Sequence, residues 1–307
     1  MQRILQPGEI EALDHVNFPR IRLPEPASLF ADRAARLAQL AEGNPIGDYL
    51  RFAARLVRAQ QRAAPAVQTT APDPETIARA QAHAMPLLPA ADHLDPAWHG
   101  VLDRLLDDVA DAPELPAPLA AVAAALRAAP AAERDRLARQ ALAESLPPAD
   151  LAAGPFVMAA LQVVLADRAS RLAVADVPYT DPATVCPVCG SAPVASVLRI
   201  GGAAGGHRYL HCGACATEWN MVRVKCSHCE STESVRYQGV EGAGDAVLAE
   251  TCGHCHTYRK LVNQEKDPLG EPLADDLATL LLDLLMGDTE FARASGNPLL
   301  ALAGSTA

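Results

Sequence analysis

All eight cysteines of the chain lie in four Cys-x-x-Cys pairs between residues 186 and 255. The pairs, which we call knuckles, are Cys186/Cys189, Cys212/Cys215, Cys226/Cys229 and Cys252/Cys255. The last two knuckles repeat the first two at an offset of 40 residues, so that each unit reads C-x2-C-x22-C-x2-C. A repeat at a fixed period indicates one structural unit used twice. The spacing is close to that of zinc-ribbon and rubredoxin-like metal sites.

Two thiolates separated by two residues can point at the same metal ion when the turn between them is tight. Two such turns supply a tetrahedron of sulfur, which suits Zn(II) or a single iron ion, and the sequence does not separate the two metals. All coordination positions would be filled by protein, so the site would have no open position for catalysis, and the sequence does not show whether the metal is redox-active or structural. The repeat predicts two ions, one held by Cys186, Cys189, Cys212 and Cys215 and the other by Cys226, Cys229, Cys252 and Cys255. An interleaved arrangement, in which the two middle knuckles pair, is the alternative that equal spacing disfavours.

Other uses of the cysteines fit the sequence less well. Disulfides need an oxidising compartment, which no other feature indicates, and a thioredoxin-type pair usually lies beside a βαβ pattern. Iron–sulfur clusters could use the same thiolates, but the two-plus-two arrangement favours mononuclear sites. Histidines are also frequent in this region, at His207, His211, His228, His254 and His256. With eight thiolates for two sites, we expect the histidines to lie behind or beside the ligands.

Bulk composition excludes several classes of function. The formal charge of −11 over 307 residues argues against a general nucleic-acid or anionic-membrane binder. The first residues lack a secretory signal, and no uninterrupted run of about eighteen apolar residues predicts a membrane-spanning helix. With reduced cysteines, this favours the cytoplasm. No P-loop, nucleophile-elbow or H-E-x-x-H motif is present, so we expect a binding protein and not an enzyme.

The elements around the knuckles predict an α+β protein. Residues 1–27 form a proline-rich arm with a short helix at 8–15, and residues 1–176 as a whole form a helical domain. Its further helices are predicted near 28–42, 45–64, 74–83, 96–110, 119–128, 131–145 and 151–172. In the second of these, Arg51, Arg55, Arg58 and Arg62 mark a solvated face.

Two tandem rubredoxin-like or zinc-ribbon-like units follow, at 181–222 and 223–265. Each is predicted to contain a hairpin, from strands at 194–200 and 207–210 in the first unit and at 234–239 and 246–250 in the second. Residues 266–307 are predicted to contribute one C-terminal helix, at 273–286, which packs on the rest. Asp275, Asp276 and Asp283 lie on its polar side and are expected to contact solvent.

Five stretches of the chain match a known family. They are RLPEPASLFADRAARLAQLAEGNPIGDYLRF (22–52), CPVCGSAPVASVLRI (186–200), RYLHCGAC (208–215), AETCGHCHTYRK (249–260) and DPLGEPLADDLATLLLDLL (267–285). The chain resembles the FdhE family of formate dehydrogenase accessory proteins over nearly its full length, and all eight cysteines match. The resemblance implies a cytoplasmic protein that binds the catalytic subunit of respiratory formate dehydrogenase before its export. It also shifts the expected metal from zinc towards rubredoxin-type iron.

Three alternatives remain open at this stage. A zinc-ribbon nucleic-acid module would need a basic face with aromatic side chains. A thiol-redox protein would need an accessible, reactive knuckle. A second copy of the chain is retained as a candidate partner, in a homodimer.

Overall fold

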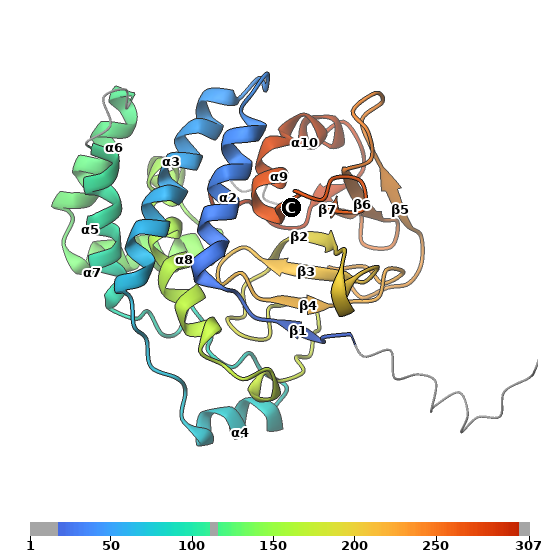
Figure 1. Ribbon diagram of the computed structural model, residues 1–307, viewed down its shortest axis with the longest axis horizontal. Coiled ribbons are helices and arrows are strands. Elements are labelled where there is room, and N and C mark those ends of the chain that lie inside the picture. Colours follow the sequence, from blue (N-terminus) through green and yellow to red (C-terminus); the bar gives the residue numbers. More distant parts are fainter. Residues whose placement is uncertain (1–17, 111–115, 301–307) are drawn as a thin grey trace, which may run out of the picture.

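The structure is a computed structural model that describes residues 18–110 and 116–300, so the short helix predicted at 8–15 lies outside the described residues. Helices form one layer, and a sheet that carries the knuckles forms the other (Figure 1). The helices before the knuckles are α2 (Pro26–Leu40), α3 (Gly47–Ala63), α4 (Pro74–Ala82), α5 (Ala97–Ala110), α6 (Ala117–Ala128), α7 (Ala131–Leu142) and α8 (Gly154–Ser170). The predicted α+β class and the helical N-terminal region are confirmed.

Helix α8 is the centre of the helical layer. Phe156, Leu161 and Val164 are all buried, because α3, α5 and α7 pack around this helix. The helical segment Pro148–Ser170 has a mean hydropathy of 1.7 and is long and apolar enough to cross a membrane. The sequence-based statement that no such segment exists was therefore wrong. Within the protein, 78% of its apolar window is buried, as in the core helix of a folded domain.

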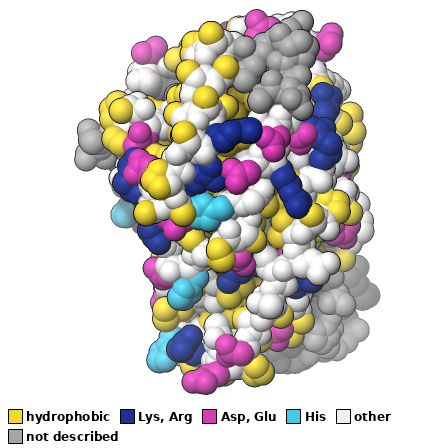
Figure 2. Space-filling view, turned by 90° about the vertical axis from the view of Figure 1, so that its left-hand side faces the viewer, with side chains coloured by type: hydrophobic (Ala, Val, Ile, Leu, Met, Phe, Trp, Pro, Cys, Tyr) yellow, Lys and Arg dark blue, Asp and Glu magenta, His cyan; other side chains and the backbone are white. Residues whose placement is uncertain are grey.

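The outer surface of the helical layer is charged. On α3, Phe52 and Leu56 face the core. Of the four arginines predicted to form a solvated face, Arg51, Arg58 and Arg62 are exposed and Arg55 is half-buried. Acidic and basic side chains are interspersed over the side of the molecule seen in Figure 2. Among the exposed ion pairs of the helical layer, Arg62 lies 3.1 Å from Asp108 on α5. Exposed pairs of this kind contribute little to stability.

The sheet contains both knuckle units. Its strands are β1 (Ile21–Arg22), β2 (Pro193–Leu198), β3 (Arg208–Cys212), β4 (Glu218–Asn220), β5 (Val235–Gln238), β6 (Val247–Cys252), β7 (Thr257–Asn263) and β8 (Ala292–Arg293). Their order is β1-β4-β3-β2-β7-β6-β5, with β8 beside β7. The predicted hairpins are β2–β3 and β5–β6, whereas β4 and β7 were not predicted.

The order of the strands repeats with the sequence. Strands β4-β3-β2 of the first unit correspond at an offset of 40 residues to β7-β6-β5 of the second. Strands β2 and β7 join the units by parallel pairing, with Ser196 opposite Leu261. The two tandem units therefore lie side by side in one sheet.

Strand β1 lies in the segment predicted as an arm. It pairs antiparallel with β4, where Ile21 is opposite Trp219 and Arg22 is opposite Glu218. Ile21 is buried, and Arg22 forms an ion pair of 3.0 Å with Glu218. A strand of two residues is too short to show an alternating pattern, so the sequence did not reveal it.

The predicted C-terminal helix is two helices, α9 (Pro272–Ala278) and α10 (Leu280–Met286). The break lies at Thr279, whose hydroxyl donates to the carbonyl of Asp275 at 2.8 Å. Lys260 of β7 donates to the carbonyls of Asp276 and Thr279 at 2.8 and 3.0 Å. These donors occupy carbonyls that a continuous helix would use for its own hydrogen bonds, so the helix is interrupted.

Asp275 and Asp276 are buried and Asp283 is partly buried, so the prediction that these residues contact solvent was wrong for the first two. Asp275 accepts a hydrogen bond of 2.8 Å from Arg36 on α2. Asp276 accepts from Arg293 on β8 at 2.6 Å, and Asp283 lies 2.6 Å from Lys260. Helical periodicity correctly placed the three carboxylates on the polar side. That side faces cations from distant segments and not water.

Candidate metal centres

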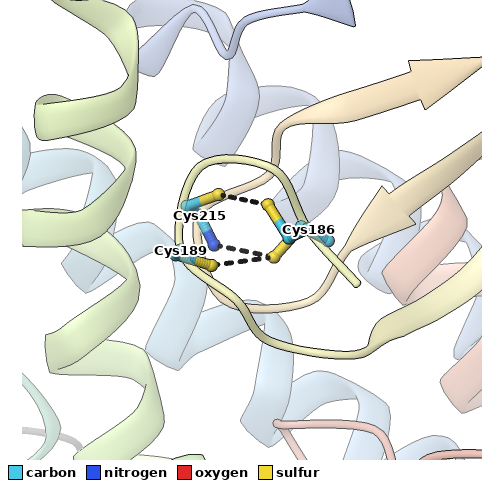
Figure 3. Close-up of side chains that lie close together, drawn as sticks. Cys186, Cys189 and Cys215 are labelled. Atoms are coloured by element: carbon cyan, nitrogen blue, oxygen red, sulfur yellow. Dashed lines mark hydrogen bonds between the residues drawn. The ribbon is translucent and has the colours of Figure 1, made fainter. Parts of the chain in front are cut away.

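The structure gathers the eight cysteine sulfurs into two separate clusters. Within each cluster the four sulfurs all lie within 4.8 Å of one another. The first cluster consists of Cys186, Cys189, Cys212 and Cys215, and the second of Cys226, Cys229, Cys252 and Cys255. This is the grouping that the repeat predicts, and not the interleaved one. Figure 3 shows the sulfurs of Cys186, Cys189 and Cys215 directed towards one another in the first cluster.

The distances between sulfurs fit a shared cation. In the first cluster, Cys186 and Cys215 are 3.5 Å apart and Cys189 and Cys212 are 3.4 Å apart. Both corresponding distances in the second cluster are 3.8 Å. A disulfide bond measures about 2.05 Å, whereas a tetrahedron with metal–sulfur bonds of about 2.3 Å has edges of about 3.8 Å. The donor set and its spacing therefore suit one tetrahedral ion per cluster.

The first knuckle of each unit has the same backbone hydrogen bonds. The amide of Cys186 donates to the carbonyl of Ser191 at 3.0 Å, and that of Cys226 to Ser231 at 2.8 Å. The residue after each knuckle has a positive φ, of 76° at Gly190 and 62° at Glu230. This left-handed residue closes the tight turn that directs both sulfurs to the same side.

The second knuckle of each unit is also repeated in detail. Ala216 and His256, which follow the knuckles, have φ values of 59° and 53°. One residue further on, the hydroxyl of Thr217 lies 3.2 Å from the sulfur of Cys215, and that of Thr257 lies 3.1 Å from Cys255. The sequence analysis did not identify these threonines as neighbours of the sulfurs. Their signal is present in the repeat as Cys-x-Thr in both units.

Burial controls the ionisation of the first cluster. It raises the pKa of Cys186 and Cys215, because a thiolate in the core is not solvated. Hydrogen bonds from Cys186, Cys212 and Cys215 lower the pKa of Cys189. Four thiolates cannot share this volume without a compensating charge, and a bound cation would supply it.

In the second cluster, burial raises the pKa of Cys226 to about 12 and also raises that of Cys229. Burial acts in the same direction on Cys252, but backbone hydrogen bonds from Cys255 and His254 oppose it and the pKa is lowered. Hydrogen bonds to the charged form favour that form. Each cluster thus contains one thiol whose pKa is lowered, Cys189 in the first and Cys252 in the second.

Of the five histidines in this region, three are next to cysteines of the second cluster in the chain, whereas His207 lies before β3 and stacks on Phe18 at 4.2 Å. His228, His254 and His256 are exposed at the surface near the second cluster. His211 is buried, and its Nδ1 lies 3.0 Å from Glu218. The four-sulfur clusters are complete without an imidazole.

Glu218 organises the sheet next to the first cluster, which the sequence analysis did not anticipate. It is buried on β4 and contacts Arg22 of β1, Arg199 after β2 and His211 of β3. Burial raises its pKa, but Arg199 and His211 outweigh this effect and hold the pKa well below its usual range. The resulting carboxylate ties three strands together beside Cys212.

Comparisons with known proteins agree with the residues of the sites. Three family models match consecutive segments of the chain: "FdhE, N-terminal" over residues 18–181, "FdhE, central domain" over 185–223 and "FdhE, C-terminal domain" over 224–300. A curated protein named "Protein FdhE homolog" from Cronobacter sakazakii is 40% identical over 307 residues, with 97% of each chain covered. A protein of the same name from Pseudomonas aeruginosa is 43% identical, with 98% of each chain covered.

A solved structure is similar as well. The crystal structure of the FdhE protein from Pseudomonas aeruginosa superposes with a TM-score of 0.82 at 39% sequence identity. The match covers 93% of this chain and 100% of that chain. The similarity extends through the helical layer and the sheet with its knuckles.

Proposed function

The chain belongs to the FdhE family, and we propose that it is a cytoplasmic accessory protein that binds the catalytic subunit of respiratory formate dehydrogenase before the subunit is exported. In this role the chain recognises another protein and catalyses no reaction of its own. The observation that carries the proposal is the pair of four-sulfur clusters within a chain of this family. The family name supports the accessory role, and the clusters supply the rigid sheet on which a recognition surface can be built.

We further propose that each cluster holds one metal ion, with iron favoured and zinc as the alternative. The distances of 3.4 to 3.8 Å between sulfurs support a mononuclear tetrahedral site. Thiolate ligands suit both metals. The second unit contributes only Ala249 and Tyr258 to a small buried cluster, so metal binding would stabilise its fold directly.

A group of exposed leucines on α10 supports a protein partner. Leu281, Leu284 and Leu285 are 57%, 72% and 45% exposed. They lie on the side of the helix opposite Leu282 and Met286, which pack on the sheet against Ala249 and Tyr258. Contiguous exposed apolar side chains are typical of binding surfaces. We assign this surface to the catalytic subunit, and a second copy of the chain is the other occupant to test.

Metal analysis tests the proposed clusters. Protein purified without oxygen should contain two equivalents of metal, and an absorption spectrum typical of iron–thiolate bonds would distinguish iron from zinc. The variants Cys189→Ser and Cys229→Ser should each lose one equivalent. Full metal content in both variants, or no metal in the purified protein, would contradict the ligand assignment.

Co-purification tests the partner. The tagged chain should retain the formate dehydrogenase catalytic subunit that still carries its export signal, and both should be found in the cytoplasmic fraction. Leu284→Asp should weaken retention, whereas Leu269→Asp, at a leucine that is 64% exposed outside α10, should not. No retention of the cognate subunit would refute the proposal. If Leu284→Asp instead changes the mass of the isolated chain in solution, the surface belongs to a homodimer.

A further inference from the structure

The two metal clusters differ in their exposure although their sequences and backbones repeat. All four cysteines of the first cluster are at most 3% exposed. In the second cluster, Cys226 and Cys252 are buried to a similar degree, but Cys229 and Cys255 are partly exposed. One edge of the second cluster, formed by the latter two residues, therefore faces solvent.

The residues next to the cysteines explain this difference. Val188, Ala214 and Ala216 of the first unit are 2%, 4% and 7% exposed. The positions 40 residues later are His228, His254 and His256, and all three histidines are exposed. Apolar side chains next to the first cluster can pack into a core, whereas imidazoles remain at the surface. The first copy of the unit thus has apolar side chains that suit burial, and the second copy has imidazoles that suit contact with solvent.

The helical layer covers the first cluster directly. Residues 87–90, between α4 and α5, run along the first knuckle, where Leu87 and Leu88 donate to the carbonyls of Pro187 and Val188 at 3.0 and 2.7 Å. On the other knuckle, Gln162 of α8 donates to the carbonyl of Gly213 at 2.6 Å. An incoming ligand can reach these sulfurs only if the contact between the helical layer and the sheet opens.

Among the described residues, the second cluster is covered less completely: the amide of Ala292 at β8 donates to the carbonyl of His256 at 2.8 Å, but Cys229 and Cys255 stay partly exposed. Gly253, the counterpart of Gly213, is exposed, and its amide donates a hydrogen bond to the carbonyl of Ser234 in the same unit. The helices that approach this unit, α9 and α10, pack on β7 and on Ala249 and Tyr258, away from the knuckle loops.

We propose that the second cluster is an exchangeable metal site and the first cluster a permanent one. At the second site, an incoming thiol or nitrogen ligand replaces the sulfur of Cys229 or Cys255 on the metal. One metal–sulfur bond would break as one bond to the new ligand forms; an incoming thiol would give up its proton as it binds, and the released cysteine thiolate would take up that proton, or one from the buffer when the new ligand is a neutral nitrogen. At the first site the same step requires local unfolding, which makes it slow.

The proposal rests on metal binding by both clusters, as proposed above, and chelation kinetics test it separately. Protein with two equivalents of zinc is mixed with the chromogenic chelator 4-(2-pyridylazo)resorcinol, and release of metal is followed by absorbance. The equivalent in the second cluster should leave faster than the equivalent in the first cluster by about tenfold or more, because only release from the first cluster requires opening of the fold. Cys229→Ser should lack the fast equivalent, and Cys189→Ser, its counterpart in the first unit, should retain it.

Alkylation of the wild-type protein gives the same information at each cysteine without a variant that could misfold. During chelation, iodoacetamide should modify Cys229 and Cys255 in the fast phase, as measured by peptide mass mapping. Cys186, Cys189, Cys212 and Cys215 should react only in the slow phase. Release of both equivalents at one rate, or fast alkylation of the first cluster, would overturn the proposal and leave metal binding intact. Failure to bind two equivalents would overturn metal binding itself, and this proposal with it.

Discussion

Arg208 on β3 donates a hydrogen bond to Glu250 on β6, and the two side chains are 1% and 2% exposed. The pair joins the first knuckle unit to the second across β2 and β7. Arg208 also donates to the carbonyl of Lys225 at 2.9 Å, directly before the third knuckle. Burial raises the pKa of Glu250, although Arg208 and Arg259 act in the opposite direction. The charge of Arg208 is therefore what permits a carboxylate at this position.

Removing Arg208 should destabilise the whole sheet. Arg208→Met leaves Glu250 buried without its cation, and we expect the free energy of unfolding to fall by about 3–5 kcal/mol. The double variant Arg208→Met/Glu250→Leu should recover much of this loss, because the buried carboxylate is removed with its cation and the remaining buried Arg259 keeps its hydrogen bonds to Ser227 and Ser295. Urea denaturation measures both effects. Arg51→Met, which removes an exposed pair with Asp48, is the control and should cause no measurable change. A single variant as stable as wild type would show that the pair is not important.

The buried carboxylate of Asp276 should make stability depend on pH. Burial raises its pKa, but Arg293 and Lys260 outweigh this effect and the pKa is lowered. Its contribution is therefore fully present above the pKa of an unfolded aspartate, about 3.9, and is lost as the pH falls through the folded pKa. Asp276→Asn should cost about 3 kcal/mol at neutral pH.

The pH dependence separates this charge effect from a packing effect. The difference in unfolding free energy between wild type and Asp276→Asn should shrink as the pH falls below about 4. Denaturation of both proteins in the same buffers measures it, and other acidic groups affect both proteins equally. A difference that stays constant down to pH 2.5 would contradict a contribution from the ionised carboxylate.

The left-handed residue after the first knuckle should favour glycine. Gly190 has a φ of 76°, and a side chain there would meet Pro86 only at an ordinary contact distance of 3.4 Å. The cost of Gly190→Ala is therefore conformational, about 1–2 kcal/mol. Gly100→Ala is the matched control, because Gly100 lies in α5 with open space around its Cα and no positive φ. The control should stabilise the protein by about 0.5–1 kcal/mol. Thermal unfolding that shows the same sign for both variants would refute this account.

Gln162 should maintain the cover over the first cluster. Gln162→Leu leaves the buried carbonyl of Gly213 without its donor, which should cost about 1–3 kcal/mol. The variant should also release metal from the first cluster faster than wild type, whereas release from the second cluster should be unchanged. Gln81→Leu, the same replacement at an exposed position, should alter neither property. Chelation kinetics and thermal unfolding provide the measurements, and an unchanged slow phase in Gln162→Leu would argue against the proposed cover.

Local patterns in the sequence were sufficient for the helices and for the grouping of the cysteines. Helical periodicity gave α3 and α8, and alternating residues beside a glycine-rich turn gave the β2–β3 hairpin. The equal spacing in the two units gave the grouping of the sulfurs. These features are visible because the interacting residues are close in the chain or are repeated at a fixed offset.

Sequence patterns did not predict contacts between residues that lie far apart in the chain. Asp275 reads as a surface residue of an amphipathic helix, and only the folded chain brings Arg36 to it across more than 200 residues. The break at Thr279 likewise depends on Lys260, which comes from a strand. Periodicity shows which side of a helix is polar, but it does not show whether water or a buried cation meets that side.

The sequence by itself determined which eight sulfurs can bind metal, how they are divided between two units and which family the chain resembles. The tertiary structure alone decided that the units join through parallel strands β2 and β7 and that the helical layer covers only the first cluster. The physical reason is the range of the interactions involved. Knuckle geometry is set within a few residues, whereas strand pairing between units and burial of a cluster depend on contacts between segments that are remote in the chain.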